Sequence, residues 1–167
     1  MKVELRELSS SDGMDILEMM KEIGPGENGF SNHHHNMKIE DFPSYLEANL
    51  AMAKGENLNP ELVPQTTYWL LINDRPVGIG KLRHRLTEKL RKSGGHIGYT
   101  IRPSEKRKGY GTILLREILV MAKEKDLNHL LLTCTEENAA SRRIIENNNG
   151  VLDEIKDGKC KYWISFP

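Results

Sequence analysis

The sequence predicts one mixed α/β (α+β) domain, in which helices flank a mostly antiparallel sheet. Segments with strand-like alternation and segments with helical periodicity follow one another along the chain. Two pairs of strand-like segments are separated by short turn sequences, as in hairpins. No repeat, low-complexity tract or linker divides the 167 residues, a length that can bury a sizeable core. We therefore expect residues 1–167 to form a single domain.

The N-terminal part of the chain predicts strands and helices in alternation. Residues 2–8 alternate in polarity as an opening strand does, and the polar residues 10–12 can cap the helix that follows. A later helix carries an apolar stripe, and a hairpin turns at residues 73–75. The predicted elements are a strand at 2–8, a helix after 12, a loop at 24–36, a helix at 40–53, a loop at 54–64 and strands at 66–72 and 76–85.

The C-terminal part repeats this alternation and ends in a second hairpin. Segment 129–134 is almost entirely apolar, as expected of a strand buried on both faces. Asn149 and Gly150 can end a helix with a left-handed residue, and Asp157-Gly158 is typical of a hairpin turn. The predicted elements are helices at 86–92, 109–125 and 138–148, and strands at 95–101, 129–134, 151–156 and 159–166.

Composition argues against several classes of protein. The 24 basic and 24 acidic residues give a net charge of zero, which argues against a nucleic-acid partner. No apolar run approaches the roughly 20 residues that span a bilayer, and the charged N-terminus does not resemble a signal peptide. Cys134 and Cys160 lie in apolar, strand-like segments, which indicates reduced, buried thiols. We expect a cytoplasmic protein with no membrane partner.

The most informative segment follows the strand predicted at 95–101. Three cations at 106–108 precede a Gly-Tyr-Gly sequence at 109–111 and the start of a helix. Glycines let oxygen atoms approach main-chain N–H groups, and a helix N-terminus adds partial positive charge, so this segment suits a pyrophosphate. The segment lacks the Gly-Lys-Ser/Thr of a P-loop, and Leu114 takes the place of the third glycine of a dinucleotide fingerprint.

Over the whole chain, this order of elements and motifs resembles the GCN5-related N-acetyltransferase (GNAT) superfamily. The first family motif, Arg/Gln-x-x-Gly-x-Gly/Ala, is matched by Lys106, Gly109 and Gly111, with lysine where Arg or Gln is usual. The second motif, Asn-x-x-Ser, is matched by Asn138 and Ser141. A bacterial subgroup of unassigned substrate is similar at 83–85, 94–99 and 162–164.

The resemblance implies the GNAT fold, in which two parallel strands, here 95–101 and 129–134, splay apart and admit the cofactor. It implies acetyl-CoA as the co-substrate, no metal, and a primary amine of a small molecule or peptide as the acceptor. The N–H of Tyr99 would donate to the acetyl carbonyl, where negative charge grows during the reaction. The residues implied to bind the cofactor are Tyr99, Ile101, Arg107, Lys108, Gly109, Tyr110, Gly111, Thr112, Asn138, Ser141 and Arg142.

The chain departs from the family at the usual catalytic acid. Many members carry a tyrosine four residues after the serine of the second motif, and this chain has Ile145 there. Tyr162, in the last predicted strand, is a candidate substitute. His96 is the first candidate for the base that takes a proton from the amine, because an ordinary histidine has a pKa near 6.5. His84 and Glu27 are the alternatives.

The acceptor site is only partly indicated by the sequence. Arg83 and Arg85 either bind a carboxylate of the acceptor or lie on a solvated face. The three histidines at 33–35 lack the spacing of metal ligands, which indicates a polar loop. A non-catalytic acyl-CoA sensor on the same fold is the alternative function, because Ile145 removes the usual acid. Edge strands in this family often pair between subunits, so a homodimer is possible.

Overall fold

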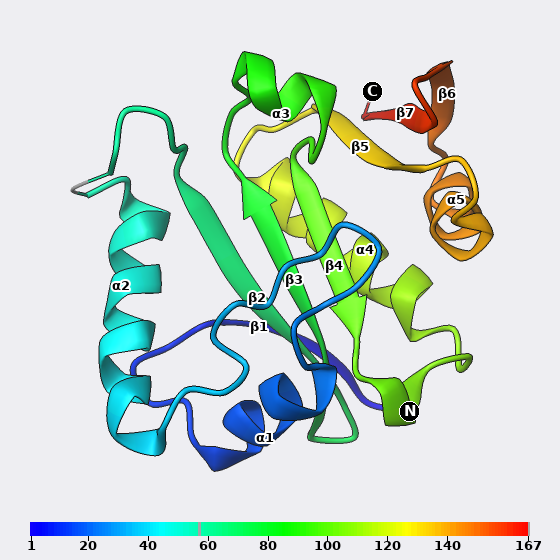
Figure 1. Cartoon of the computed structure of the whole chain (residues 1–167). Coiled ribbons are helices and arrows are strands. Elements are labelled where there is room, and N and C mark those ends of the chain that lie inside the picture. The colour runs from blue at the N-terminus through cyan, green and yellow to red at the C-terminus, as the bar shows by residue number, and fades with distance from the viewer. Residues whose placement is uncertain (57, 167) are drawn as a thin grey trace.

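The computed structural model describes residues 1–56 and 58–166, so residue 57 of the predicted loop at 54–64 and residue 167 of the predicted domain lie outside the description. Within the described residues, the strands form two antiparallel sheets, ordered β1-β2-β3-β4 and β5-β7-β6 (Figure 1). The strands are β1 Val3–Glu7, β2 Gln65–Ile72, β3 Arg75–Arg83, β4 Ile97–Ile101, β5 His129–Thr135, β6 Val151–Lys156 and β7 Lys159–Ser165. The helices are α1 Met14–Ile23, α2 Phe42–Lys54, α3 Glu88–Lys92, α4 Tyr110–Glu124 and α5 Ala139–Asn147, with short 3-10 helices η1 Ile39–Asp41 and η2 Pro103–Glu105.

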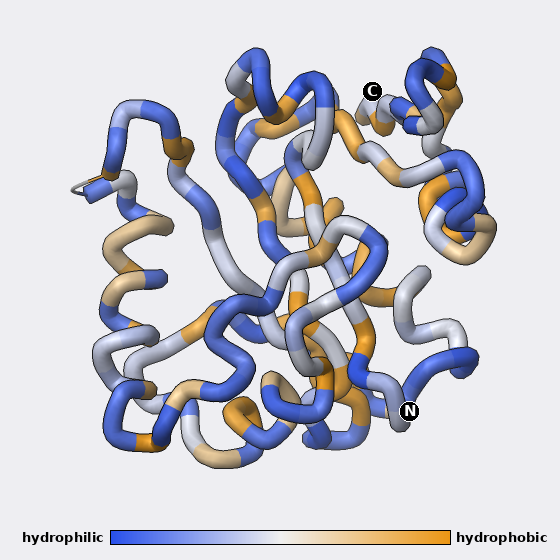
Figure 2. Tube along the Cα trace, in the orientation of Figure 1, coloured by the Kyte–Doolittle hydropathy of each residue, from blue (hydrophilic) through white to orange (hydrophobic). Residues whose placement is uncertain are grey.

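The first sheet is covered on both faces. Successive side chains of β2 point to opposite faces, so Leu70 packs in the cluster that contains α4 and Trp69 packs in the cluster that contains α1 and α2. Gly80 of β3 lets α4 come close, because a Cβ there would lie 2.2 Å from Cδ1 of Ile118. Figure 2 shows hydrophobic segments along the central strands and hydrophilic segments in the surrounding loops. This packing fixes α4, and with it the cation- and glycine-containing segment at its N-terminus.

Strands β4 and β5 meet at one end and belong to different sheets. The main-chain N–H of His96 donates to the carbonyl of Leu131 at 2.8 Å, and the N–H of Leu131 donates to Nδ1 of His96 at 2.9 Å. Gly95 permits this contact, because a Cβ there would lie 2.3 Å from the Leu131 carbonyl oxygen. Beyond the junction β4 is the edge strand of its sheet, with main-chain groups outside any ladder of the described residues. The predicted fold class, including the splayed strand pair, is confirmed.

Two predicted boundaries shift because of backbone conformation. Strand β4 begins at Ile97 and not at residue 95, because Gly94 and Gly95 have φ angles of 107° and 61°, outside the extended region. Helix α4 begins at Tyr110, because Gly109 has a φ of 81° and serves as the N-cap. Gly94 and Gly95 therefore precede β4, and Gly109 marks the start of α4.

Candidate functional site

A cavity of about 670 Å³ opens between the end of β4, the N-terminus of α4 and α5. Most of the residues predicted to bind the cofactor line it, namely Tyr99, Ile101, Arg107, Gly109, Tyr110, Gly111, Thr112, Asn138 and Ser141. Lys108 and Arg142 do not. The remaining lining residues are Glu27, Asn28, Thr100, Glu105, Lys106, Ala140, Arg143, Ile144 and Asn147. The two motifs separated by about 30 residues in the sequence therefore face one cavity.

The N-terminus of α4 forms one end of this cavity. Helix α4 has 15 residues, and its N-cap, Gly109, provides no side-chain acceptor for the N–H groups of the first turn. Gly111 brings α4 close to α5, because a Cβ there would lie 2.6 Å from Cδ1 of Ile144. Uncapped N–H groups and the positive end of the helix dipole together suit an anion such as a phosphate.

The three cations before Gly109 differ in their surroundings. Nζ of Lys106 forms an ion pair with the Glu27 carboxylate from the loop after α1, and both residues line the cavity. Lys108 turns to Glu105, with its Nζ 2.8 Å from the carboxylate. Arg107 lines the cavity, and its φ of 63° places it in the left-handed region. Two of these three cations are therefore paired with carboxylates that an incoming phosphate would have to displace or tolerate.

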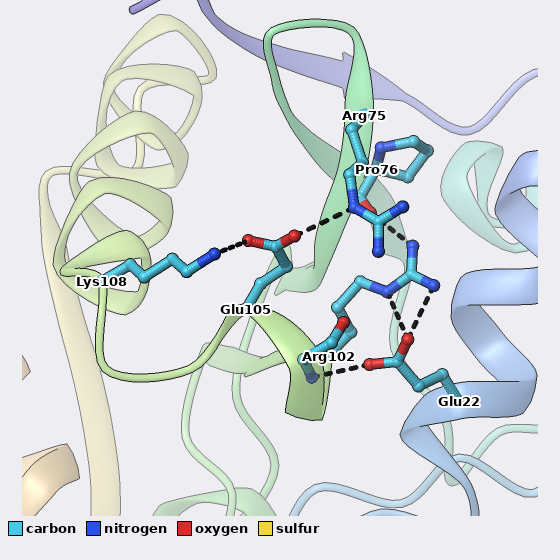
Figure 3. Close-up of polar contacts among 7 residues, drawn as sticks. Glu22, Arg75, Pro76, Arg102, Glu105 and Lys108 are labelled. Carbon is cyan, nitrogen blue, oxygen red and sulfur yellow. Dashed lines mark hydrogen bonds and ion pairs between the residues drawn. The ribbon is translucent and has the colours of Figure 1, made fainter.

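A network of ion pairs anchors the turn that leads to these cations (Figure 3). The guanidinium of Arg102, at the end of β4, donates to the Glu22 carboxylate of α1 at 2.8 and 3.0 Å. The main-chain N–H of Ser104 also donates to Glu22, and Glu105 accepts from Arg75 of β3 at 3.0 Å. Burial opposes ionisation of Glu22, but the bonds from Arg102 and Ser104 prevail and lower its pKa to about 2. The turn is thus tied to both α1 and β3.

At the other end of the cavity, a side-chain contact joins β4 to α5. The Tyr99 hydroxyl lies 2.9 Å from Oγ of Ser141, and the main-chain N–H of Ser141 donates to Oδ1 of Asn138. Asn138 is therefore the N-cap of α5. Burial raises the pKa of Tyr99 to about 12, although the hydrogen bond to Ser141 opposes the rise. The phenol consequently remains protonated near neutral pH.

The structure places both candidate basic histidines outside the cavity lining. His96 is buried at the junction of β4 and β5, where its Nδ1 accepts from the Leu131 N–H. Burial, with neighbouring charges such as Arg91, lowers the pKa of His96 to about 4. Nε2 of His84 lies 2.7 Å from the Thr66 hydroxyl, and burial lowers its pKa. His96 in this position connects the two sheets.

Tyr162, the candidate acid, is fully buried and lies outside the cavity lining. Its hydroxyl accepts from Nε of Arg142 at 3.0 Å and donates to Glu146 at 3.4 Å. Arg142, predicted to reach the phosphates, therefore turns toward the core side of α5. Its neighbour Arg143 lines the cavity instead.

Sequence reasoning did not assign several lining residues. In α5 these are Ala140, Arg143, Ile144 and Asn147. They recur at intervals of three and four residues, so the helical period counted from Asn138 and Ser141 could have identified this face. Asn28, from the loop after α1, has a φ of 52° and no signal in the sequence that points to the cavity.

The titratable side chains and the helices of residues 1–56 and 58–166 bear on metal binding and on membrane insertion. No group of three His, Cys, Asp or Glu side chains in that part of the chain could hold a metal ion. The histidines at 33–35 separate in space: His34 packs on Tyr45, and Nδ1 of His35 contacts the Asn32 carbonyl. No described helix is both long and apolar enough to cross a membrane.

The fold and the cavity together define a class of protein. A gap between two splayed strands, closed by an uncapped helix N-terminus and cations, suits a long cofactor that carries phosphates. The family model described as an acetyltransferase (GNAT) domain matches residues 2–150. The chain therefore belongs to the GNAT acetyltransferase family. Comparison with curated proteins finds no match.

Solved structures support the same fold at low sequence identity. The N-acetyltransferase PseH of Campylobacter jejuni, in complex with acetyl coenzyme A, has a TM-score of 0.65 and 12% identity, covering 99% of this chain and 100% of that chain. The ribosomal L7/L12 alpha-N-protein acetyltransferase RimL, in complex with coenzyme A, has a TM-score of 0.70, 16% identity and coverage of 98% and 94%. The microcin C7 self-immunity acetyltransferase MccE, with acetyl-CoA and AMP, has a TM-score of 0.70, 13% identity and coverage of 99% and 93%.

Proposed function

We propose that this protein transfers the acetyl group of acetyl-CoA to a primary amine of a small molecule or peptide. The cavity carries the proposal, because it joins the N-terminus of α4 to the contact between Tyr99 and Ser141. One end suits phosphates, and the other offers polar groups beside the edge of β4. PseH and MccE, which share the fold, were solved with acetyl-CoA, and this supports the choice of cofactor.

The residues present fit this cofactor in three places. The main chain from Arg107 to Thr112 would hold the pyrophosphate, assisted by the positive charges of the same segment. The edge of β4 from Tyr99 to Ile101 would pair with the pantetheine as an added strand does. Asn138 and Ser141, at the start of α5, would contact the pantetheine from the other side.

The proposed chemistry requires a modest contribution from the protein. Bound acetyl-CoA supplies an activated thioester. The amine nitrogen forms a bond to the acetyl carbon as the carbon–sulfur bond breaks; the amine releases a proton and the sulfur gains one. The N–H of Tyr99 donates to the carbonyl oxygen as its negative charge grows, and positioning of the two reactants supplies much of the rate.

We assign the proton for the departing sulfur to the Tyr99 hydroxyl. This hydroxyl lines the cavity, is oriented by Ser141 and stays protonated because burial raises its pKa to about 12. The same burial would raise the pKa of a thiol beside it, which favours the transfer. Tyr99 thus takes the part that a tyrosine at the position of Ile145 plays in many relatives; Ile145 is buried in the core.

The catalytic roles expected for His96 and Tyr162 are not part of this proposal. Nδ1 of His96 is occupied by the Leu131 N–H, and the Tyr162 hydroxyl is held between Arg142 and Glu146. Neither residue lines the cavity. No base is assigned, and the amine can lose its proton to water before it reacts.

A non-catalytic acyl-CoA sensor is the second candidate, favoured by the apolar Ile145. Release of free coenzyme A distinguishes the two functions. The protein is incubated with acetyl-CoA and pools of amino acids, polyamines, aminoglycosides and peptides, and the free thiol is measured. Thiol release that depends on an amine supports the enzyme, and binding of acetyl-CoA without release in any pool supports the sensor.

A further inference from the structure

A half-buried lysine lies on the face of the first sheet opposite α4. Side chains of β3 alternate, so Ile79, Lys81 and Arg83 point toward α1, α2 and the loop between them. Within residues 1–56 and 58–166, no carboxylate lies within 4.0 Å of Nζ of Lys81. Burial and the nearby charge of Arg83 lower the pKa of Lys81, and no acid acts in the opposite direction. A half-buried cation with no counter-ion can be stabilised by an anionic ligand that completes its surroundings.

The strand register places this ammonium beside the proposed reaction site. Lys81 is the cross-strand partner of Gly98, the residue before Tyr99 on β4. Paired residues in such a ladder have Cα atoms about 5 Å apart, so Lys81 lies next to the strand whose other edge borders the cavity. Gly98 itself places no side chain on this face.

The surroundings of Lys81 contain one buried, unsatisfied polar atom and an aromatic ring. Thr67, its partner on β2, has a buried hydroxyl with no hydrogen-bond partner in the described part of the chain. The ring of Phe30 lies 5.1 Å from Nζ of Lys81 and within 4 Å of the position of a Cβ on Gly98. Figure 1 shows the loop between α1 and α2, which carries Phe30, passing over β3 and β4.

Arg83, the neighbouring cation on this face of β3, already has oxygen partners within the protein. Its Nη1 donates to the carbonyls of Gly94 and Gly95 at 3.3 and 3.1 Å, so its guanidinium holds the turn before β4. Arg85, the other arginine considered from the sequence, is exposed. Lys81 is therefore the cation on this face that is half-buried and has no oxygen partner among the described residues.

We infer that Lys81 binds an anionic group of the acceptor, so the acceptor is an amine that also carries a carboxylate or a phosphate. This inference rests on the proposed acetyl transfer. The anion would lie against Lys81, with the Phe30 ring as one wall, and the amine would extend past Gly98 toward the carbonyl held by Tyr99. The positive charge of Arg83 strengthens the preference for an anion and disfavours polycationic amines.

The test compares acceptors that differ only in the anion. The anionic acceptors are the common α-amino acids and phosphoethanolamine. Each has a neutral match that lacks the anion: the amino-acid amide for an α-amino acid, and ethanolamine for phosphoethanolamine. Spermidine is the polycationic acceptor. Release of coenzyme A is measured for the wild type, Lys81→Met, Lys81→Arg and Lys156→Met, a control at an exposed position on β6. Comparing the amino acids with phosphoethanolamine shows whether Lys81 binds a carboxylate or a phosphate.

We expect the wild type to prefer an anionic amine. Lys81→Met should lower kcat/KM for that amine about ten- to a hundredfold and leave the neutral match unchanged, as loss of a charged hydrogen bond does. Lys81→Arg should retain most activity, and Lys156→Met should behave as the wild type. Lys81→Met should also melt at the same or a higher temperature, because it removes an unpaired charge; a merely structural lysine would give a lower melting temperature.

Three outcomes contradict the inference while leaving acetyl transfer intact. The first is a wild-type preference for neutral or cationic amines. The second is an equal loss on anionic and neutral amines in Lys81→Met. The third is turnover of the neutral matches, with acetyl-CoA binding intact by calorimetry, and turnover of none of the anionic amines. Absence of acetyl-CoA binding in the wild type contradicts the proposed function itself.

Discussion

The hydroxyl of Tyr99 lies 2.9 Å from Oγ of Ser141, and this contact joins β4 to α5 across the cavity. The two residues are 42 positions apart in the sequence, and they come from the two segments that border the gap between the sheets. We propose this hydroxyl as the proton donor, in place of the tyrosine that many relatives carry at the position of Ile145.

Replacing Tyr99 with Phe should lower kcat about 10²- to 10⁴-fold, the usual contribution of a general acid, without weakening acetyl-CoA binding. The main-chain N–H at this position is unchanged in the variant, so only the hydroxyl is tested. Single-turnover kinetics and calorimetric titration measure the two effects. Tyr162→Phe is the matched control, because its hydroxyl lies outside the cavity, and should keep its kcat. Full activity in Tyr99→Phe would remove this residue as the proton donor.

Replacing Gly109 with Val should weaken acetyl-CoA binding at least tenfold. The φ of 81° at Gly109 is strained for a side chain by roughly 1–2 kcal/mol, and relief of that strain moves the first turn of α4. Gly158→Val is the control, since Gly158 has a similar φ of 76° and equally open space, but lies in the β6–β7 turn. Both variants should lose similar thermal stability. Equal acetyl-CoA affinity in the two would argue against the phosphate site at α4.

Replacing Glu27 with Gln should strengthen acetyl-CoA binding a few-fold. The Glu27 carboxylate pairs with Lys106 at the mouth of the cavity, where it competes with an incoming phosphate. Exposed ion pairs contribute roughly 0–1 kcal/mol, which sets the size of the gain. Glu61→Gln, at an exposed position, should leave the dissociation constant unchanged. Weaker binding in Glu27→Gln would show that the carboxylate does not compete with the cofactor.

The fold should lose stability between pH 6.5 and pH 4.5 because of His96. Its pKa is about 4 in the folded protein and an ordinary 6.5 in the unfolded chain, so between these values the unfolded chain binds a proton that the folded chain does not. This stabilisation is present above pH 6.5 and falls as the pH is lowered, by on the order of 2 kcal/mol. The loss from His96 is complete near pH 4. Below pH 4.5 Glu22, with its pKa lowered to about 2, adds a further loss.

Urea unfolding at several pH values measures this slope. His96→Asn keeps an oxygen that can accept from the Leu131 N–H and should flatten the slope between pH 6.5 and pH 4.5. His33→Asn, at an exposed loop position, should keep the wild-type slope. An unchanged slope in His96→Asn would mean that His96 titrates alike in the folded and unfolded states.

Much of the candidate site could be predicted from local sequence. The cations and glycines at 106–111 predicted the N-terminus of a helix, and Asn138 with Ser141 predicted the start of the next one. Their meeting in one cavity followed from the family resemblance. Local patterns had enough information here because each motif combines a turn with the first residues of its own helix.

Other features depended on contacts between distant segments. Arg142 and Arg143 differ by about 100° around α5, so the sequence alone did not decide which one faces the cavity. The burial of Tyr162 could have been predicted, because Cys160, Tyr162 and Ile164 alternate along β7 and face the core. The contact of His96 could not have been predicted in this way, because it depends on Leu131, which lies 35 residues away on another strand.

Calorimetric titration with acetyl-CoA, beside coenzyme A and ATP, tests the central claim most directly. The account predicts selective micromolar binding of acetyl-CoA, equivalent to about 8 kcal/mol, that is weakened in Gly109→Val and retained in Tyr99→Phe. Absence of acetyl-CoA binding at millimolar concentration, or equal binding of ATP, would contradict the assignment of the cavity to this cofactor.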